Sequence, residues 1–164
     1  MAHKKMDNLT PVVWITGASS GIGAELAKQY SKRNINLILS ARRAEVLFRV
    51  KESYKGVAKI EILPFDIKDF DSAPKQVEKA LLFFGRVDVL INNAGISQRS
   101  LIIDSKFDVF KKLIEIDYLG TVALSRAILP YFISQKSGHY VVVSSVMGKF
   151  GSPYRSGYCG AKHA

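Results

Sequence analysis

The sequence predicts an α/β protein in which helices cover both faces of a doubly wound parallel sheet. Short apolar runs alternate with longer segments of helical periodicity, which is the pattern of strand–helix–strand units with right-handed crossovers. Glycine, amide and hydroxyl residues gather where the predicted strands end, and open sheets of this kind bind ligands beyond the carboxyl ends of their strands. The 164 residues suffice for one ordinary domain.

The first part of the chain supplies three strands and two helices. Residues 12–16 form a buried-strand candidate that Gly17 closes, and residues 22–33 repeat apolar side chains every four positions, as an amphipathic helix does. The same reasoning predicts a helix over 44–53 and strands over 37–40 and 60–63.

A third helix is predicted from about Ser72 to Phe84, because Pro74 fits its first turn and Gly85 its end. The remaining elements are a strand over 87–91, a long helix over 107–133, a strand over 139–144, and a helix that begins near 154 and reaches the last residue. Five strands with helical crossovers complete the predicted sheet.

The balance of 48% hydrophobic and 23% charged residues is that of a globular protein and excludes a disordered one. The 24 Lys and Arg exceed the 14 Asp and Glu, and the net charge of +10 raises polyanions as partners. However, the chain has no run of five or more basic residues and no interleaved aromatic stacking platforms. We therefore expect solvated helix faces and no specific nucleic-acid binding.

A single cysteine, Cys159, excludes an internal disulfide, and no Cys/His group has the spacing of metal ligands, so we expect no metal site. No apolar run approaches the ~18 residues of a membrane span. Residues 1–10 form a polar N-terminal stub without the apolar core of a signal peptide. The sequence therefore predicts a soluble intracellular domain or the soluble part of a longer protein.

The first chemistry-bearing cluster joins the first strand to the first helix. Glycines there permit a tight turn and close approach of a phosphate, and the helix N-terminus offers unpaired N–H groups. The spacing is G-x-x-x-G-x-G, and no lysine follows to make a P-loop. The candidate cofactor-binding residues are Gly17, Ser19, Ser20, Gly21, Ile22 and Gly23; a purely structural turn is the alternative.

Arg42 follows the second strand, where a dinucleotide-binding domain meets the adenosine ribose. An acidic residue there would bind the 2′-hydroxyl of NAD(H), whereas a guanidinium suits a 2′-phosphate, so NADP(H) is favoured over NAD(H). The alternative is a pair of solvated arginines, Arg42 and Arg43. Asp66, after the third strand, could bind the adenine amino group or cap the next helix.

Asn92-Asn93-Ala94-Gly95 ends the fourth strand, where the amides could tie strands together while the backbone faces a ligand; a common turn is the alternative. Ser144 and Ser145 end the fifth strand. Tyr158 and Lys162 stand four residues apart and so share one helix face, about 5–6 Å apart at Cβ. A nearby ammonium favours the phenolate, which makes Tyr158 a candidate acid/base.

Together these motifs resemble the short-chain dehydrogenase/reductase family, from about Val12 to the last residue. Ser145 lies thirteen residues before Tyr158, as in the family pattern, and is the expected catalytic serine. The amino-acid sequence of residues 93–97, 118–121 and 157–159 is similar to that of the branch of 11β-hydroxysteroid-dehydrogenase-like reductases, which are often membrane-anchored. The resemblance implies a Rossmann-type domain over 11–164, C-terminally incomplete, with Asn93, Ala94 and Gly95 facing the cofactor.

The resemblance also implies a mechanism. NADPH would deliver a hydride to a substrate carbonyl carbon, and Tyr158 would give the oxygen a proton, or take one during alcohol oxidation. Ser145 would hydrogen-bond the same oxygen, and Lys162 would assist Tyr158 while binding the nicotinamide ribose. The expected partner is a small carbonyl or alcohol compound of unspecified identity.

The chain departs from the family pattern at Asp117, where most members carry the asparagine of the active-site proton relay. Its backbone carbonyl could still hold a water beside Lys162, so Asp117 remains a catalytic candidate. Its carboxylate could pair with the Lys162 ammonium and partly cancel the help that Lys162 gives Tyr158. We expect slower proton transfer or a displaced pH optimum.

The chain also ends two residues after Lys162, where family members continue. A part of a longer enzyme, a truncated nucleotide-binding scaffold without turnover, and a small enzyme rebuilt by dimerisation are the possible explanations. The full-length protein is expected to form homo-oligomers and to reach a membrane only through an anchor outside these residues. A cytoplasmic and an endoplasmic-reticulum-associated location both stay open.

Overall fold

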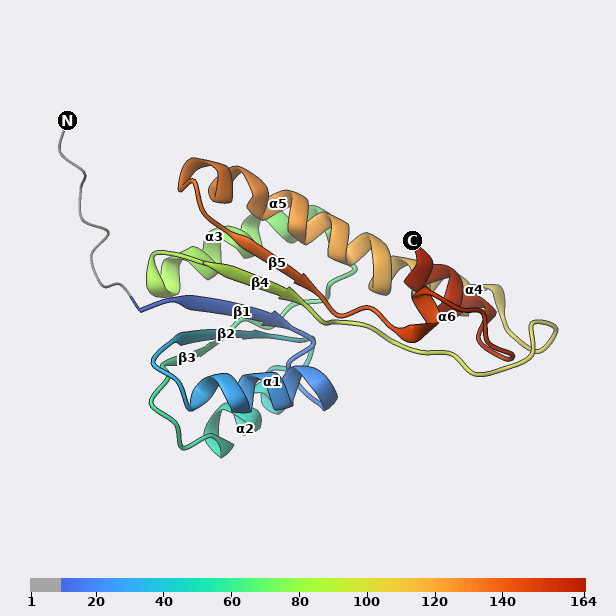
Figure 1. The fold of residues 1–164 in the computed structure, drawn as a ribbon, viewed down its shortest axis with the longest axis horizontal. Helices are drawn as coiled ribbons and strands as arrows, with labels where there is room; N and C mark the ends of the chain where they lie inside the picture. The colour runs from blue at the N-terminus through green and yellow to red at the C-terminus, as the bar shows by residue number, and fades with distance from the viewer. Residues whose placement is uncertain (1–9) are drawn as a thin grey trace.

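A computed structural model describes residues 10–164, and the polar stub predicted over 1–10 therefore lies almost wholly outside the described residues. The predicted parallel sheet is confirmed: five strands pair in the order β3-β2-β1-β4-β5, all in parallel register (Figure 1). The strands are β1 (Val12–Thr16), β2 (Asn36–Ser40), β3 (Ile60–Ile62), β4 (Val89–Asn92) and β5 (His139–Val142).

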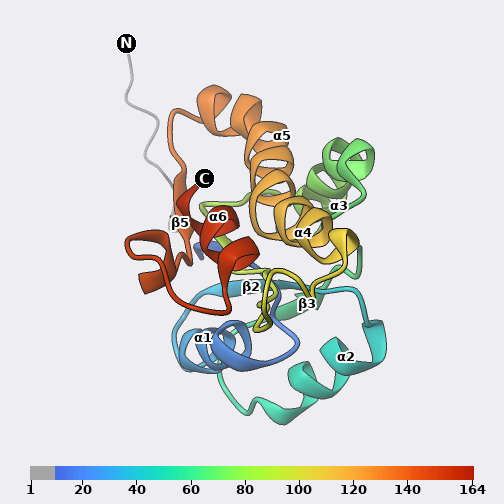
Figure 2. The same ribbon diagram turned by 90° about the vertical axis from the view of Figure 1, so that its right-hand side faces the viewer.

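Helices cover both faces of the sheet, as predicted. The helices are α1 (Gly21–Ser31), α2 (Ala44–Ser53), α3 (Ala73–Phe84), α4 (Phe107–Ile114), α5 (Gly120–Ser134) and α6 (Ser156–His163), with short helical turns η1 (Phe70–Ser72), η2 (Glu115–Leu119) and η3 (Val146–Gly148). α1 and α2 pack on one face, α3 and α5 on the other (Figure 1). α4 and α6 lie beyond the carboxyl ends of the strands (Figure 2).

β1 shows why the strand sequences read as continuous apolar runs. Val12 and Trp14 face the core under α3 and α5, and the intervening Val13 and Ile15 face the core under α1 and α2. All five residues of β1 are buried because the strand is central and covered on both sides. This burial fixes the register of β1, and with it the position of the loop that follows Thr16.

The long helix predicted over 107–133 is interrupted by a π-helical turn. α4 ends at Ile114, η2 supplies five π-helical residues, and α5 continues from Gly120. Such turns insert an extra residue into the helical ladder and are frequent at functional sites. This one contains Asp117 and directs its side chain into the protein, where it is buried.

Smaller differences concern element ends. The strand predicted over 87–91 is β4, which begins at Val89 because its ladder with β5 starts at the Val89–His139 pair. The ladder ends at the Asn92–Val142 pair, so β5 is shorter than the predicted 139–144. α6 begins at Ser156 instead of 154.

The core predicts unequal costs for two leucine substitutions on α5. Leu124 is fully buried between α5 and the sheet, whereas Leu129 on the same helix is 43% exposed. Leu124→Ala should lower the free energy of unfolding by about 2–5 kcal/mol, because it removes packed methyl groups and leaves a cavity. Leu129→Ala should cost clearly less; urea denaturation of both variants measures the difference, and equal losses would contradict the described core.

Candidate functional site

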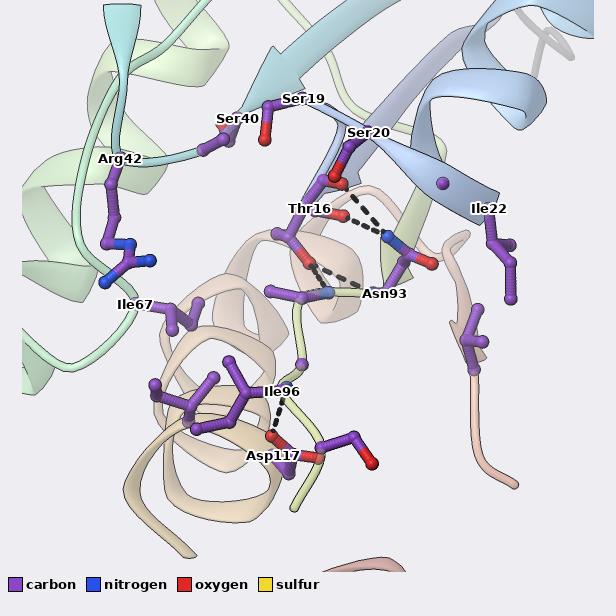
Figure 3. Close-up of a pocket in the computed structure, with 18 of the residues that line it drawn as sticks. Thr16, Ser19, Ser20, Ile22, Ser40, Arg42, Ile67, Asn93, Ile96 and Asp117 are labelled. Carbon is purple, nitrogen blue, oxygen red and sulfur yellow. Dashed lines mark hydrogen bonds between the residues drawn. The ribbon is translucent and has the colours of Figure 1, made fainter. Parts of the chain in front are cut away.

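A cleft of about 440 Å³ lies at the carboxyl ends of β1 and β4, where the chain's crossovers diverge to opposite faces of the sheet (Figure 3). This is the switch point at which open α/β sheets bind ligands. Of the residues predicted for the site, all line the cleft except Gly23 and Ser145. The structure adds lining residues that sequence reasoning did not assign to the site: Thr16, Ser40, Ala41, Arg43, Phe65, Ile67, Ile96, Ser97, Ile116, Val143 and Ser144.

The glycine-rich loop is shaped by contacts that leave no room for side chains. Gly17 has φ +65°, and a Cβ there would lie 2.8 Å from Ala94 Cα. A Cβ at Gly23 would lie 2.5 Å from both Asn93 Nδ2 and the Gly17 oxygen. Gly23 therefore acts from beneath the cleft: it lets α1 pack against the turn that follows β4.

The N-terminus of α1 opens toward the cleft. Ser20 is the N-cap residue, yet its side chain makes no capping hydrogen bond, and the first turn of α1 carries no acidic residue. Gly21, with φ +55°, has no described heavy atom within 4 Å of the position where a Cβ would stand. The backbone N–H groups and the positive end of the helix dipole are thus available to an anion such as a phosphate.

Thr16 holds the ends of β1 and β4 together (Figure 3). Its Oγ1 accepts hydrogen bonds from the backbone N–H groups of Asn93 at 3.0 Å and Ala94 at 3.1 Å, and donates to the Ile91 carbonyl at 3.3 Å. The Asn93 amide returns the contact, since Nδ2 donates to the carbonyls of Thr16 at 3.0 Å and Gly17 at 3.2 Å. A lone hydroxyl residue at the end of an apolar strand was the available sequence signal for Thr16.

The two amides after β4 divide the work of tying elements together. Asn93 binds the end of β1, while Asn92 Nδ2 donates to Ser125 Oγ on α5 at 3.0 Å. The sequence-based interpretation that these amides join neighbouring elements fits these contacts. Gly95 follows in the same turn, where a Cβ would meet Asp117 Oδ2 and Lys162 Nζ at 3.4 Å.

The other end of the cleft, after β2, carries Arg42 (Figure 3) and its neighbour Arg43, and both side chains are exposed. Within residues 10–164, neither guanidinium has a carboxylate oxygen within 4.0 Å, so their charge is available to a ligand. Asp66 also lines this end; its Oδ1 accepts from the Lys68 N–H at 3.0 Å and closes a turn. Asp66 does not cap a helix, because the N-cap of η1 is Asp69.

Tyr158 and Lys162 stand one turn apart on α6 and face the cleft together. Lys162 Nζ lies 5.8 Å from the centroid of the Tyr158 ring and donates to the Val143 carbonyl at 3.3 Å. The same Nζ is 3.5 Å from Asp117 Oδ2. The Lys162 side chain is only 10% exposed and the Asp117 side chain is not exposed at all, so this ion pair is little screened by water.

Asp117 joins the turn after β4 to α6. Its Oδ1 accepts from the Ile96 N–H at 2.8 Å, while Oδ2 has no hydrogen-bond partner among the described residues and only the Lys162 ion pair nearby. Burial raises the pKa of Asp117, and the Ile96 N–H and the Lys162 ammonium oppose that rise by stabilising the carboxylate. The Asp117 carboxylate therefore compensates part of the positive charge of Lys162 inside the protein.

Ser145 and its neighbour Ser144 hold different positions. The Ser145 hydroxyl caps η3 by accepting from the Met147 N–H at 3.1 Å, and of these two serines only Ser144 lines the cleft. An accepting hydroxyl keeps its own proton free to donate. The assignment of Ser145 as the catalytic serine stays a prediction.

The fold and the cleft define a doubly wound α/β protein with an anion-binding helix N-terminus and a Tyr–Lys pair at its switch point. The family model for short chain dehydrogenase matches residues 11–164. The chain belongs to this family of oxidoreductases, as its motifs predicted.

Curated relatives agree with this assignment. Dehydrogenase/reductase SDR family member 7 of Homo sapiens is 49% identical over 158 residues, which cover 93% of this chain and 47% of the relative. The dehydrogenase/reductase SDR family protein 7-like of Drosophila melanogaster is 40% identical over 168 residues, covering 98% and 52%. The chain thus spans about half the length of these relatives.

Solved structures confirm the fold class. A short-chain dehydrogenase from Streptomyces avermitilis has a TM-score of 0.86 at 32% identity, over 94% of this chain and 56% of that one. ElxO with NADP bound has a TM-score of 0.86 at 32% identity, over 94% and 63%. A short chain dehydrogenase/reductase from Burkholderia phymatum in complex with NAD has a TM-score of 0.89 at 25% identity, over 94% and 56%. Structural neighbours therefore bind either dinucleotide.

In the part of the chain that the structure describes, no helix has the length and apolarity needed to cross a membrane. The same residues contain no group of three or more His, Cys, Asp or Glu side chains placed to hold a metal ion.

Two glycine substitutions test the packing beneath the cleft. Gly23→Ala should lower the free energy of unfolding by about 1–3 kcal/mol, because the new methyl group overlaps Asn93 and Gly17. Gly160→Ala on α6 is the matched control: no heavy atom lies within 4 Å of its Cβ position, and alanine should stabilise the helix by up to about 1 kcal/mol. Urea denaturation distinguishes them, and a Gly23→Ala variant as stable as the parent would contradict the described contact.

Proposed function

We propose that this protein is an oxidoreductase that transfers a hydride between NADP(H) and a carbonyl or alcohol substrate, with Tyr158 as general acid and base. The observation that carries the proposal is the Tyr158–Lys162 pair in the same cleft as the glycine-rich start of α1. A phosphate-binding helix end and a proton-transferring phenol within one cleft are what a reaction between a dinucleotide and a small carbonyl compound requires.

The residues present fit a dinucleotide. The close contacts at Gly17 and Gly23 keep side chains out of the loop, so that backbone N–H groups of the first turn of α1 can bind the pyrophosphate. Arg42 would bind the 2′-phosphate of the adenosine ribose, because its guanidinium is exposed at the cleft and residues 41–44, directly after β2, include no acidic residue. Asp66 would accept a hydrogen bond from the adenine amino group.

When bound, NADP(H) supplies or accepts the hydride. Tyr158 gives its phenolic proton to the substrate oxygen during reduction and takes a proton from the alcohol during oxidation. Lys162 favours the phenolate electrostatically and binds the hydroxyls of the nicotinamide ribose, and Ser145 donates a hydrogen bond to the substrate oxygen. Asn93, Ala94 and Gly95 present their backbone to the nicotinamide side of the cleft.

A second candidate function is a nucleotide-binding scaffold without turnover. The observation that favours it is the Asp117 carboxylate beside Lys162, which reduces the electrostatic help available to Tyr158. Titration with NADPH, followed by an NADPH-consumption assay of the full-length protein over several carbonyl compounds, separates the two candidates. Binding without turnover on any of them would favour the scaffold.

The proposal extends to organisation. Residues 11–164 would form the cofactor-binding part of a longer enzyme, since the curated relatives are about twice as long. Homo-oligomers would form through the exposed apolar side chains of α4 and α5, including Phe107, Leu129 and Ile133. Association with a membrane such as that of the endoplasmic reticulum would require an anchor beyond residues 10–164.

The assignment of Arg42 predicts a change in cofactor preference. Arg42→Gln should weaken NADPH binding by about 10- to 100-fold, the value of one or two charge-assisted hydrogen bonds, and NADH binding much less. Fluorescence titration with both dinucleotides gives the ratio of the two Kd values. Arg49→Gln, an exposed arginine on α2 outside the cleft, is the control and should leave the ratio unchanged. Equal weakening of both dinucleotides would argue against a role in phosphate recognition.

The Asp117–Lys162 pair predicts a displaced pH–rate profile. Asp117→Asn keeps an oxygen for the Ile96 N–H but removes the negative charge beside Lys162. The basic limb of carbonyl reduction should move to lower pH by up to about one unit, because the full ammonium charge then promotes proton loss from Tyr158.

The raised pKa of Asp117 determines how the pH–rate profiles of the parent and Asp117→Asn differ at acidic pH. As the pH falls through this pKa the parent's carboxylate becomes neutral, so the two profiles should converge there and diverge above it. Glu115→Gln is the matched control, because Glu115 lies in the same π-helical turn but pairs with Lys68 and Lys111. Identical profiles for the parent and Asp117→Asn would refute the effect.

A further inference from the structure

Two cations flank the Tyr158 ring. Lys162 Nζ lies 5.8 Å from the ring centroid, and the guanidinium carbon of Arg155 lies 5.9 Å from it. Arg155 immediately precedes α6 and stands three residues before Tyr158, so both residues are placed by the same helix start. The catalytic candidate thus carries a neighbouring guanidinium that the mechanism above does not use.

The two cations differ in how their charge is compensated. Lys162 is nearly buried and has the Asp117 carboxylate and the Val143 carbonyl as partners. Arg155 is half-buried, and its one side-chain hydrogen bond among residues 10–164 joins Nη1 to Ser97 Oγ at 2.7 Å. No carboxylate within those residues approaches it to 4.0 Å. A guanidinium has five N–H donors, so most of its donor capacity and all of its charge remain available.

The position of Arg155 points to the substrate and not to the cofactor phosphates. Ser97, its hydrogen-bond partner, lines the cleft and follows β4, while α6 follows β5. Arg42 and Arg43 follow β2, on the other side of β1 in the sheet. Arg155 itself does not line the cleft; its bond to Ser97 holds the guanidinium beside the cleft, on the side of Tyr158 and away from Arg42.

We propose that Arg155 binds a carboxylate of the substrate, so that the preferred substrates are oxo acids whose acidic group lies a few bonds from the reacting carbonyl carbon. A carbonyl oxygen held by the Tyr158 phenol brings groups a few bonds away within reach of a guanidinium beside the same ring. The planar fork of arginine matches a carboxylate with two parallel hydrogen bonds. This inference rests on the proposed function and adds the substrate class.

The test compares oxo acids with their own methyl esters, which keep the reacting carbonyl and lose the charge. The full-length protein is assayed with NADPH on 2-, 3- and 4-oxo acids and on each ester, and the acid-to-ester ratio of kcat/KM is the readout. The parent should favour the acid in at least one pair. Arg155→Gln should lower that ratio by tenfold or more, because it removes a charge-assisted, bidentate contact.

Two further variants separate recognition from loop support. Ser97→Ala removes the hydrogen bond to Arg155 but leaves the guanidinium, so the ratio should persist. Arg126→Gln changes an exposed arginine on α5 that, unlike Arg155, contacts neither Ser97 nor the Tyr158 ring, and it should also preserve the ratio. A ratio unaffected by Arg155→Gln, a parent that favours the esters, or an equal fall in Ser97→Ala would each overturn the proposal.

Binding measurements decide the case if no carbonyl compound is turned over, which would be a failure of the proposed function. Calorimetric titration of the same oxo acids into the protein saturated with NADP then provides the readout. Binding to the parent that Arg155→Gln weakens tenfold or more supports the role of Arg155. Absent binding, or binding that the variant leaves unchanged, overturns it.

Discussion

The contact between the ends of β1 and β4 is the constraint on which the site depends. One hydroxyl, that of Thr16, makes three hydrogen bonds there, and the Asn93 amide adds two more in the opposite direction. The turn they hold lies so close to Gly17 and Gly23 that a methyl group at either glycine would overlap it. The N-terminal end of α1 and the turn after β4 are thereby fixed as one wall of the cleft. Without this contact the sheet would still have a switch point, but no defined surface at it.

Asp117 extends that wall to α6. The π-helical turn η2 directs a carboxylate inward, one oxygen toward the Ile96 N–H and the other toward Lys162. The arrangement connects the turn after β4 with α6 across the floor of the cleft. It also carries an electrostatic cost, since a buried carboxylate beside the lysine offsets part of the charge that would assist Tyr158 in the proposed reaction. In the proposed reaction, the position of Asp117 would support proton transfer while its charge would oppose it.

Some of the chain's excess positive charge lies at or beside the cleft. Arg42 and Lys162 line the cleft, Arg155 is hydrogen-bonded to its lining residue Ser97, and the surroundings of the three cations differ. Lys162 forms an ion pair with Asp117, whereas Arg42 and Arg155 have no carboxylate partner among the described residues. A net charge of +10 first points to polyanions in general. In the structure, the two cations without a carboxylate partner lie at and beside one cleft, which is the proposed binding site of a small molecule.

The sequence by itself determined the fold class, the succession of strands and helices along the chain, and most of the residues that line the cleft. Apolar periodicity and the glycine, amide and Tyr–Lys motifs are local signals, and residues such as Gly17, Asn93 and Lys162 could be assigned from them. Only the tertiary structure decided the rest. Two features depend on local backbone geometry: the π-helical turn at Asp117 and the capping bond of Ser145. Two others join residues far apart in sequence: the hydrogen bonds of Thr16 to the turn after β4 and the contact of Arg155 with Ser97. Side-chain identity states which bonds a residue can make; which partner it meets is set by how the sheet and helices pack, and no local pattern encodes that.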